Sequence, residues 1–331
     1  MLSTVTIIVI VLLALSFDFI NGFHDTANAI ATTVSTKALK LKYAIILAAI
    51  FNFLGAILFT GVAKTIASEI VDLKTVANGS AVMMAAMISA ILWNLITWYF
   101  GIPSSSSHAL IGSLAGAGLA DAGASAIRIH GFEKIVIFLI ISPLVALTMG
   151  FIVYSIIRFV FKNANLGKAN HGFRLFQIVT AAMQAFSHGT NDAQKSMGII
   201  TMALVSCHYQ NDMKIHTWVQ ISCALAMALG TSVGGWRIIK TVGTQIMKLK
   251  PVNAVAADLS STIIIQVATL MHQPVSTTHV ISSSIMGVGS ASRVKGVKWS
   301  TAKKMLSAWV TTIPITIIIS AGVFSIFKLF L

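Results

Sequence analysis

The chain has 331 residues, of which 56% are hydrophobic and only 10% are charged, and its mean hydropathy is +0.87. A soluble domain carries about 25% charged residues, so this composition excludes a soluble globular protein and predicts an integral membrane protein. The formal net charge of +14 then reflects how Lys and Arg are distributed across a membrane, and no nucleic-acid partner is expected.

Apolar segments follow one another along the chain, each near the roughly 20 residues that a helix needs to cross a bilayer. They predict an all-α integral membrane fold of about ten transmembrane helices. The expected crossings are 4–35, 43–63, 79–100, 103–120, 135–157, 175–206, 216–235, 254–271, 274–292 and 305–327. Segments 103–120 and 274–292 are short and rich in Gly and Ser, so a re-entrant path is the alternative for each.

The basic residues predict how these segments are oriented. If the N-terminus is outside, most Lys and Arg fall in loops that are then cytoplasmic, as the positive-inside rule requires. The predicted external loops hold Glu69, Asp72, Asp121, Glu133 and Asp212. We therefore expect a multi-pass protein of the cytoplasmic (inner) membrane with both termini outside.

Two sequence motifs occur once in each half of the chain. Residues 21–28 align with residues 188–195, which places the aspartates of the two motifs over each other (192 − 25 = 167). Pro-Ser-Ser-Ser-Ser-His at 103–108 aligns with Pro-Val-Ser-Thr-Thr-His at 274–279 (274 − 103 = 171). Because two independent motifs share nearly the same separation, the chain is predicted to contain an internal duplication.

The duplicated halves are expected to have opposite orientations, because each contains an odd number of crossings. Inverted repeats are typical of secondary transporters, whose substrate and ion sites lie near the bilayer midplane. We expect the first repeat at 1–160, a basic cytoplasmic linker at 161–174 and the second repeat at 175–331.

Three carboxylates lie inside apolar segments, at Asp18, Asp25 and Asp192. An ionised carboxylate in a bilayer costs several kcal/mol unless it is paired or hydrated, so these residues predict a polar cavity. Asp18 lies seven residues before Asp25 on the same helix face, and it either lines this cavity or accepts a hydrogen bond from a neighbouring helix.

Each aspartate motif contains poor helix formers, Asn21-Gly22 in the first half and Gly189-Thr190-Asn191 in the second. These residues predict helices broken at mid-span, with free backbone groups facing a cavity. Backbone carbonyls together with a carboxylate are suited to Na⁺ or a proton.

The Pro-Ser motifs are expected to provide hydrogen-bond donors, in contrast to the carboxylates and carbonyls of the aspartate motifs. Proline favours the first turn of a helix, so the hydroxyls at 104–107 and 276–278 are expected at positively polarised helix starts, which bind phosphate-like anions. A protonated phosphate can donate a hydrogen bond to a carboxylate of the site. Sulfate cannot, and an unpaired buried acceptor costs about 1–3 kcal/mol. Phosphate is the favoured substrate, and a sulfate or other oxyanion permease of the same fold is the alternative.

The two aspartate motifs and the two Pro-x-Ser-(Ser/Thr)-(Ser/Thr)-His motifs resemble the paired signatures of the inorganic phosphate transporter (PiT) family, over nearly the whole chain. The resemblance implies phosphate symport with Na⁺ or H⁺, without a further cofactor, and a homodimer. Gly22-Phe23-His24-Asp25 departs from the family's usual Gly-Ala-Asn-Asp. In the repeat alignment Lys195 takes the place of Asn28. A lysine at this position resembles that of the bacterial members that are proton-coupled, and the resemblance implies that its fixed ammonium replaces one Na⁺.

The candidate residues follow from the motifs and from this resemblance. The substrate-binding candidates are Asp25, Asn28, Ser105, Ser106, Ser107, Asn191, Asp192, Lys195, Ser276, Thr277 and Thr278. The coupling-ion candidates are Asp25, Asn28, Asp192, Asp258 and Asp18, with a possible Na⁺ at Asp25 and Asp192.

An enzymatic function is not expected. Ser, His and Asp all occur within the spans, so an intramembrane hydrolase is a remote alternative. The Ser-rich motif lacks the Gly-x-Ser-x-Gly context of a nucleophile elbow, and no Walker-type phosphate loop is present to support direct ATP drive.

Overall fold

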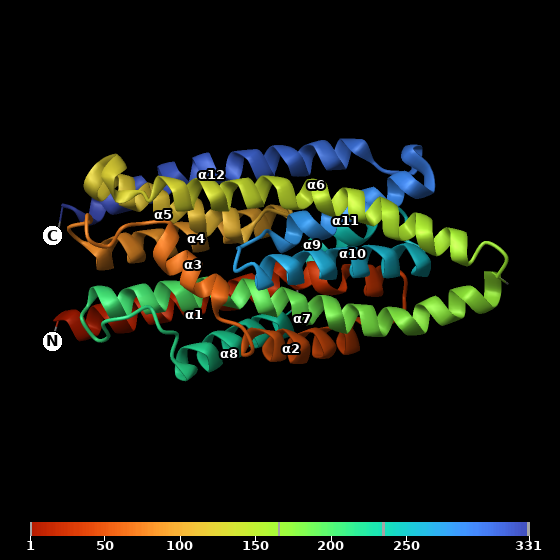
Figure 1. Ribbon diagram of the computed structural model, residues 1–331, viewed down its shortest axis with the longest axis horizontal. Helices are drawn as coiled ribbons and strands as arrows, with labels where there is room; N and C mark the ends of the chain where they lie inside the picture. The colour runs from red at the N-terminus through yellow and green to blue at the C-terminus, as the bar shows by residue number, and fades with distance from the viewer. Residues whose placement is uncertain (1, 165, 234–235, 330–331) are drawn as a thin grey trace.

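The computed structural model describes residues 2–164, 166–233 and 236–329, and the elements in these ranges are helices. They lie roughly along one axis, and both chain ends lie at the same end of the bundle (Figure 1). The elements are α1 (Leu2–Ser35), α2 (Leu41–Ala56), α3 (Gly61–Glu69), α4 (Gly79–Phe100), α5 (Ser106–Ala122), η1 (Gly123–Ala126), α6 (Ile129–Val160), α7 (Leu166–Ser206), α8 (Thr217–Val233), α9 (Trp236–Lys240), η2 (Thr241–Gln245), α10 (Pro251–Leu270), α11 (Thr277–Arg293), η3 (Val294–Gly296) and α12 (Trp299–Phe327). The all-α membrane fold expected from the sequence is confirmed.

Six helices of the described chain are long and apolar enough to cross a membrane, or up to eight if each of two bent pairs forms one span. The bent pairs are α2 with α3, at 67°, and α8 with residues 238–245, at 73°. Of the ten expected crossings, α7 and α11 do not meet this test, because α7 is rich in polar residues and α11 has only 17 residues. The part of the expected linker from Leu166 onward is helical and forms the first turns of α7.

The two halves interlock through equivalent helix pairs. Helix α1 packs along α8, and its repeat counterpart α7 packs along α2. In the same way α5 packs along α12, and α11 packs along α6. Each of these four interfaces joins one half to the other, so the halves form one packed body, as an inverted duplication requires.

The aspartate motifs lie within continuous helices, so the expectation of broken helices at these positions is wrong. The glycines serve close packing instead. A Cβ on Gly22 would meet the backbone oxygen of Met227 in α8, and a Cβ on Gly189 would meet the backbone oxygen of Asn52 in α2. The breaks occur in the partner helices, after Ala56 and Val233, where the bent pairs are joined.

The helices that follow the Pro-Ser motifs start side by side in the interior. Ser107 Oγ donates a hydrogen bond to the backbone oxygen of Val275 at 2.7 Å, and the rings of His108 and His279 are 4.5 Å apart. From this point α5 runs toward the end that holds the termini and α11 toward the opposite end (Figure 1). By length and apolar character, residues 106–126 meet the test for a membrane span, as expected for 103–120, whereas α11 in the segment 274–292 does not.

Candidate functional site

Asp25 lies in the interior of α1 among neutral hydrogen-bond donors. Its Oδ1 accepts hydrogen bonds from Asn28 Nδ2 at 3.2 Å and Thr278 Oγ1 at 3.0 Å, and its Oδ2 accepts one from Ser106 Oγ at 3.0 Å. His24 Nδ1 lies 2.9 Å from the same Oδ1. Because Ser106 belongs to α5 and Thr278 to α11, this carboxylate joins the starts of both short helices, and its side chain is buried.

Asp192 occupies the equivalent place in α7 and differs from Asp25 in its charge environment. Its Oδ2 accepts hydrogen bonds from Thr277 Oγ1 at 3.2 Å and Asn21 Nδ2 at 3.4 Å. Its Oδ1 accepts one from Lys195 Nζ at 2.8 Å, and both side chains are fully buried. One aspartate of the duplicated pair is therefore held by a fixed cation, and the other by hydroxyl and amide groups.

Asp25 and Asp192 converge on one point together with His188. One ligand atom from each of these three residues lies within 4.8 Å of the other two. His188 Nδ1 lies 3.0 Å from Asn52 Oδ1, and its Nε2 lies 3.3 Å from Asp192 Oδ2 without a hydrogen-bond partner in the described chain. Two buried carboxylates and a ring nitrogen at this separation are suited to a shared cation or proton, because like charges repel strongly in a low-dielectric interior.

Two amide oxygens add to this acceptor-rich set. Asn21 Oδ1 and Asn28 Oδ1 are buried and have no hydrogen-bond partner among the described residues. Their Nδ2 groups donate to Asp192 and Asp25 respectively, so both amides are held beside the carboxylates. Unpaired buried oxygens cost about 1–3 kcal/mol each, and hard cations take oxygen ligands of this kind.

The hydroxyls of the two Pro-Ser motifs have three separate uses. Ser105 and Ser276 cap their helices, because their side chains accept hydrogen bonds from the backbone N–H of His108 and His279. Ser106, Thr277 and Thr278 donate to the two site carboxylates, as described above.

The third use is to hold the turn before α11. Ser107 donates to the Val275 carbonyl. Asn191 Oδ1 accepts a hydrogen bond from the Val275 backbone N–H at 3.2 Å, and its Nδ2 donates to the carbonyl oxygen of Gln273 at 3.1 Å. Of the predicted substrate residues, Ser105, Ser107, Asn191 and Ser276 thus use these groups to shape the backbone.

Two predicted ion residues lie in separate clusters. Asp18 Oδ1 accepts a hydrogen bond from Ser196 Oγ at 2.7 Å. Asp258 in α10 accepts hydrogen bonds from Thr32 Oγ1 at 2.8 Å and Thr180 Oγ1 at 3.0 Å. Neither residue belongs to the group formed by Asp25, His188 and Asp192.

Sequence reasoning missed three residues that contact the carboxylates. His188, Asn21 and His24 all belong to the aspartate motifs, and the repeat alignment places Asn21 over His188. No binding role is predicted for any of them from the sequence, and Asn21 is interpreted there only as a poor helix former. The helical spacing held the signal, because residues three or four apart share a face, and Asn21 and His188 each lie four residues before an aspartate.

Comparison with known proteins identifies the family. The family model described as "Phosphate transporter family" matches residues 21–320. The chain belongs to the phosphate transporter family. As a family member with several apolar helices, it is a multi-pass membrane protein and a transporter rather than an enzyme.

Relatives of this phosphate transporter family member share nearly its full length. It is 63% identical over 315 residues to a probable low-affinity inorganic phosphate transporter of Bacillus subtilis, covering 95% of each chain. It is 44% identical to a protein of the same description from Rhizobium meliloti, covering 94% of this chain and 93% of the relative. A solved structure described as the sodium-dependent phosphate transporter has the same fold, with a TM-score of 0.92, 24% identity and coverage of 99% of this chain and 100% of that one.

Proposed function

We propose that this transporter is a secondary active symporter that moves inorganic phosphate across the cytoplasmic membrane, coupled to Na⁺ or H⁺, by alternating access. The observation that carries the proposal is the junction of the two repeats. There Asp25 and Asp192 meet the starts of α5 and α11, and donors, carboxylates and helix N-termini are gathered in one buried place.

Phosphate binds between the starts of α5 and α11. The positive ends of both helices attract the anion, and Ser106, Thr277 and Thr278 exchange their hydrogen bonds to the carboxylates for bonds to phosphate oxygens. A P–OH group of the substrate donates to Asp25 or Asp192 in return. This exchange favours phosphate over sulfate by about 1–3 kcal/mol, because a fully deprotonated sulfate leaves a carboxylate oxygen unpaired.

The coupling ion occupies the acceptor group formed by Asp25, His188 and Asp192. The relevant support is the separation of at most 4.8 Å between their ligand atoms and the unpaired oxygens of Asn21 and Asn28 nearby. Asp258, in its separate cluster, is a second coupling position. A cation or proton between the carboxylates removes their mutual repulsion and lets the anion approach.

Lys195 supplies a permanent positive charge where the first repeat has Asn28. Its Nζ lies 2.8 Å from Asp192 Oδ1, so it neutralises one carboxylate whatever the cation gradient. One coupling ion fewer is therefore needed on the Asp192 side, and the gradient acts mainly through Asp25.

The inverted repeats exchange conformations to open the site alternately to each side. With both termini outside, phosphate enters from the end of the bundle that holds the termini and leaves at the opposite end. We also expect two copies of the chain to associate as a homodimer, as the family resemblance implies.

Uptake into proteoliposomes tests the proposal. Labelled phosphate and labelled sulfate are supplied to the purified protein under an imposed Na⁺ or pH gradient. We expect gradient-dependent, uphill accumulation of phosphate and much weaker uptake of sulfate. Equal transport of both anions would remove the proposed role of the carboxylates in selectivity, and uptake without any gradient dependence would indicate a channel. A hydrolase would show no uptake.

Variants of the site separate its two proposed tasks. Asp25→Asn and Asp192→Asn should abolish coupled uptake, whereas Ser106→Ala and Thr277→Ala should mainly raise the half-saturation concentration for phosphate. Ser325→Ala is the matched control, because this exposed hydroxyl bonds only to Ala321 in its own helix. Near-normal transport by both Asn variants would rule out the proposed ion site.

A further inference from the structure

A cavity of about 950 Å³ lies outside the site described above, between the turn that precedes α5 in the interior and the first turns of α12, at the end of that helix away from the C-terminus. It is bounded by the C-terminal end of α4, the turn at 101–103, residues of α9 and η2, and the first turns of α12. Lys240, Lys303 and Lys304 are among the residues that line it.

The charged residues that line the cavity are all basic. No Asp or Glu lines it, and no salt bridge among the described residues involves its three lysines. Thr301 and Ser307, which carry hydroxyl groups, also line it. Several like charges without a counter-ion repel one another, so an anionic occupant would relieve this repulsion.

Aromatic residues of α4 also line the cavity. Trp93, Tyr99 and Phe100 of α4 line it, and the side chains of Tyr99 and Phe100 are 61% and 68% exposed. A smaller groove of about 350 Å³, lined by apolar side chains of α4 that include Leu95 and Trp98, shares Tyr99 and Phe100 with the cavity. A free phosphate ion makes no use of such a surface, whereas an acyl chain does.

We propose that this cavity binds the headgroup of an anionic phospholipid, with an acyl chain lying along the aromatic face of α4. Aromatic side chains and lysines near helix ends are the groups that meet the membrane interface. The basic residues then contact the phosphate of the lipid, and the groove over Leu95 and Trp98 contacts its hydrocarbon.

The other repeat provides an internal comparison. Buried positions of α6 and α12 correspond at a separation of 170, as in Leu139 and Trp309 (309 − 139 = 170). At this separation Lys303 corresponds to Glu133, and Ser307 corresponds to Ile137. Lys304 corresponds to Lys134, so this lysine recurs, whereas the counterparts of Lys303 and Ser307 are a carboxylate and an apolar side chain. The basic lining is therefore repeated only in part in the other half.

The lipid would also contact the backbone that leads into the phosphate site. The floor of the cavity includes Gly101 and Pro103, and the motif hydroxyls follow directly. Thr241 Oγ1 donates to the carbonyl oxygen of Gly101 at 3.2 Å, and Trp309 Nε1 donates to that of Pro103 at 3.2 Å. Occupancy of the cavity is therefore expected to stabilise the turn that carries Ser104 and the start of α5.

Native mass spectrometry of the delipidated, detergent-purified protein tests the proposal. The probes are phosphatidylglycerol, phosphatidylcholine and inorganic phosphate, each added alone. We expect phosphatidylglycerol to give a discrete bound species at several-fold higher occupancy than phosphatidylcholine. The double variant Lys303→Gln/Lys304→Gln should lose this preference. The control Lys40→Gln/Lys42→Gln, which removes two exposed charges from the same end, should keep it.

A shape variant separates the cavity from general surface charge. Ser307→Ile/Thr311→Ile leaves all three lysines in place but fills the cavity with the side chain that the other repeat has at Ile137 and Ile141. We expect it to reduce phosphatidylglycerol occupancy as well. Equal loss in both lysine double variants would assign the binding to surface charge and overturn the proposal. Binding of inorganic phosphate alone that is lost in Lys303→Gln/Lys304→Gln would identify the cavity as a phosphate site and would also overturn the proposal.

Discussion

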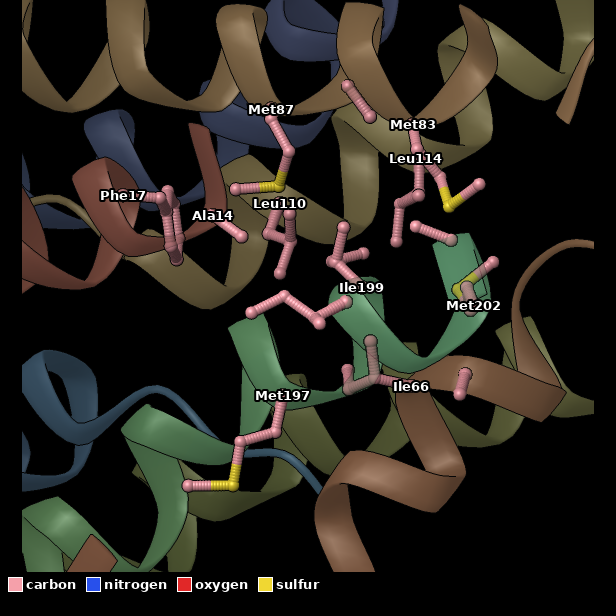
Figure 2. Packing of buried hydrophobic residues seen from close by; sticks show 14 of the residues in the cluster. Ala14, Phe17, Ile66, Met83, Met87, Leu110, Leu114, Met197, Ile199 and Met202 are labelled. Carbon is pink, nitrogen blue, oxygen red and sulfur yellow. The ribbon is translucent and has the colours of Figure 1, made fainter. Parts of the chain in front are cut away.

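Two buried regions flank the paired aspartates, one on the side of the chain ends and one on the opposite side. The internal duplication relates them, but they differ in polarity. Between the site and the end that holds the termini, most of the packed side chains are apolar, and Asp18 with its donor Ser196 forms a buried polar pair among them. Figure 2 shows Phe17, Met83, Met87, Leu110 and Ile199 packed together there, from α1, α4, α5 and α7. These side chains are buried, and burial of such surface contributes about 25 cal/mol per Å².

The opposite flank is polar and equally buried. Asp258 accepts hydrogen bonds from Thr32 and Thr180, and Ser261 Oγ donates to Gln184 Oε1 at 2.6 Å. The Nε2 group of Gln184 has no hydrogen-bond partner in the described chain. Buried polar groups of this kind are usually completed by water or an ion.

The two flanks occupy equivalent positions in the inverted repeats. At the motif separations, Met87 corresponds to Asp258 (258 − 87 = 171), and Ile199 corresponds to Thr32 (199 − 32 = 167). Phe17 corresponds to Gln184 (184 − 17 = 167) in the same way. The duplication has kept the aspartates and hydroxyls of the site while its two approaches have become chemically different. An apolar approach stays dry, whereas a polar approach admits water.

The largest effect is expected from placing the polar residue of one flank into the other. Met87→Asp puts a carboxylate into a buried apolar cluster, so we expect a loss of about 3–5 kcal/mol in the free energy of unfolding. Thermal unfolding of the purified protein in detergent measures it. Met87→Leu, which conserves volume and polarity, should cost less than about 1.5 kcal/mol. Similar midpoints for the two variants would contradict the apolar character of this flank.

A second comparison separates the two site aspartates. Asp192→Asn leaves the Lys195 ammonium buried without its carboxylate, so we expect a loss of about 3–5 kcal/mol. Asp25→Asn removes an acceptor of neutral donors and should cost about 1–3 kcal/mol. Adding Lys195→Asn to Asp192→Asn removes the unpaired charge, so the double variant should recover part of the loss in the thermal unfolding midpoint. The pairing of Asp192 with Lys195 would be refuted by equal midpoints for the two single variants.

The paired glycines test the feature that the two halves share. Gly22→Ala and Gly189→Ala each force a Cβ against a backbone oxygen of the partner helix, so each should destabilise the protein by about 1–3 kcal/mol. Gly172→Ala in α7 is the control, because nothing lies within 4 Å of the added Cβ, and it should stabilise the exposed helix by up to about 1 kcal/mol. If the three variants unfold alike, the glycines are not packing determinants.

Much of the fold followed from the sequence because it rests on spacing. The two motif separations predicted the inverted repeat, and apolar length predicted the helices. The positions of the helix breaks did not follow, because Gly22 and Gly189 look like helix breakers in isolation. Their role depends on the carbonyls of α8 and α2, which lie far away in the sequence.

The site was predictable to a similar degree. Asp25, Asp192 and the hydroxyls of Ser106, Thr277 and Thr278 were recognisable as unusual polar groups in apolar segments. The division of the motif hydroxyls between carboxylate contacts and helix caps required coordinates. Neighbouring serines are chemically alike, and only the start of α5 decides that Ser105 caps the helix while Ser106 faces Asp25.

The smallest stability effect is expected at the polar flank. In Asp258→Asn the amide oxygen still accepts from Thr32 or Thr180, so one hydrogen bond is lost and the cost should be about 1 kcal/mol. The charge is lost completely, however, so the dependence of phosphate uptake on an imposed Na⁺ or pH gradient should weaken. The matched change Thr180→Val also removes one bond to Asp258 but keeps its charge, so its gradient dependence should be unchanged. If both variants lose stability and gradient dependence to the same extent, the Asp258 carboxylate has a structural role and no role in coupling. The two flanks would then differ only in polarity.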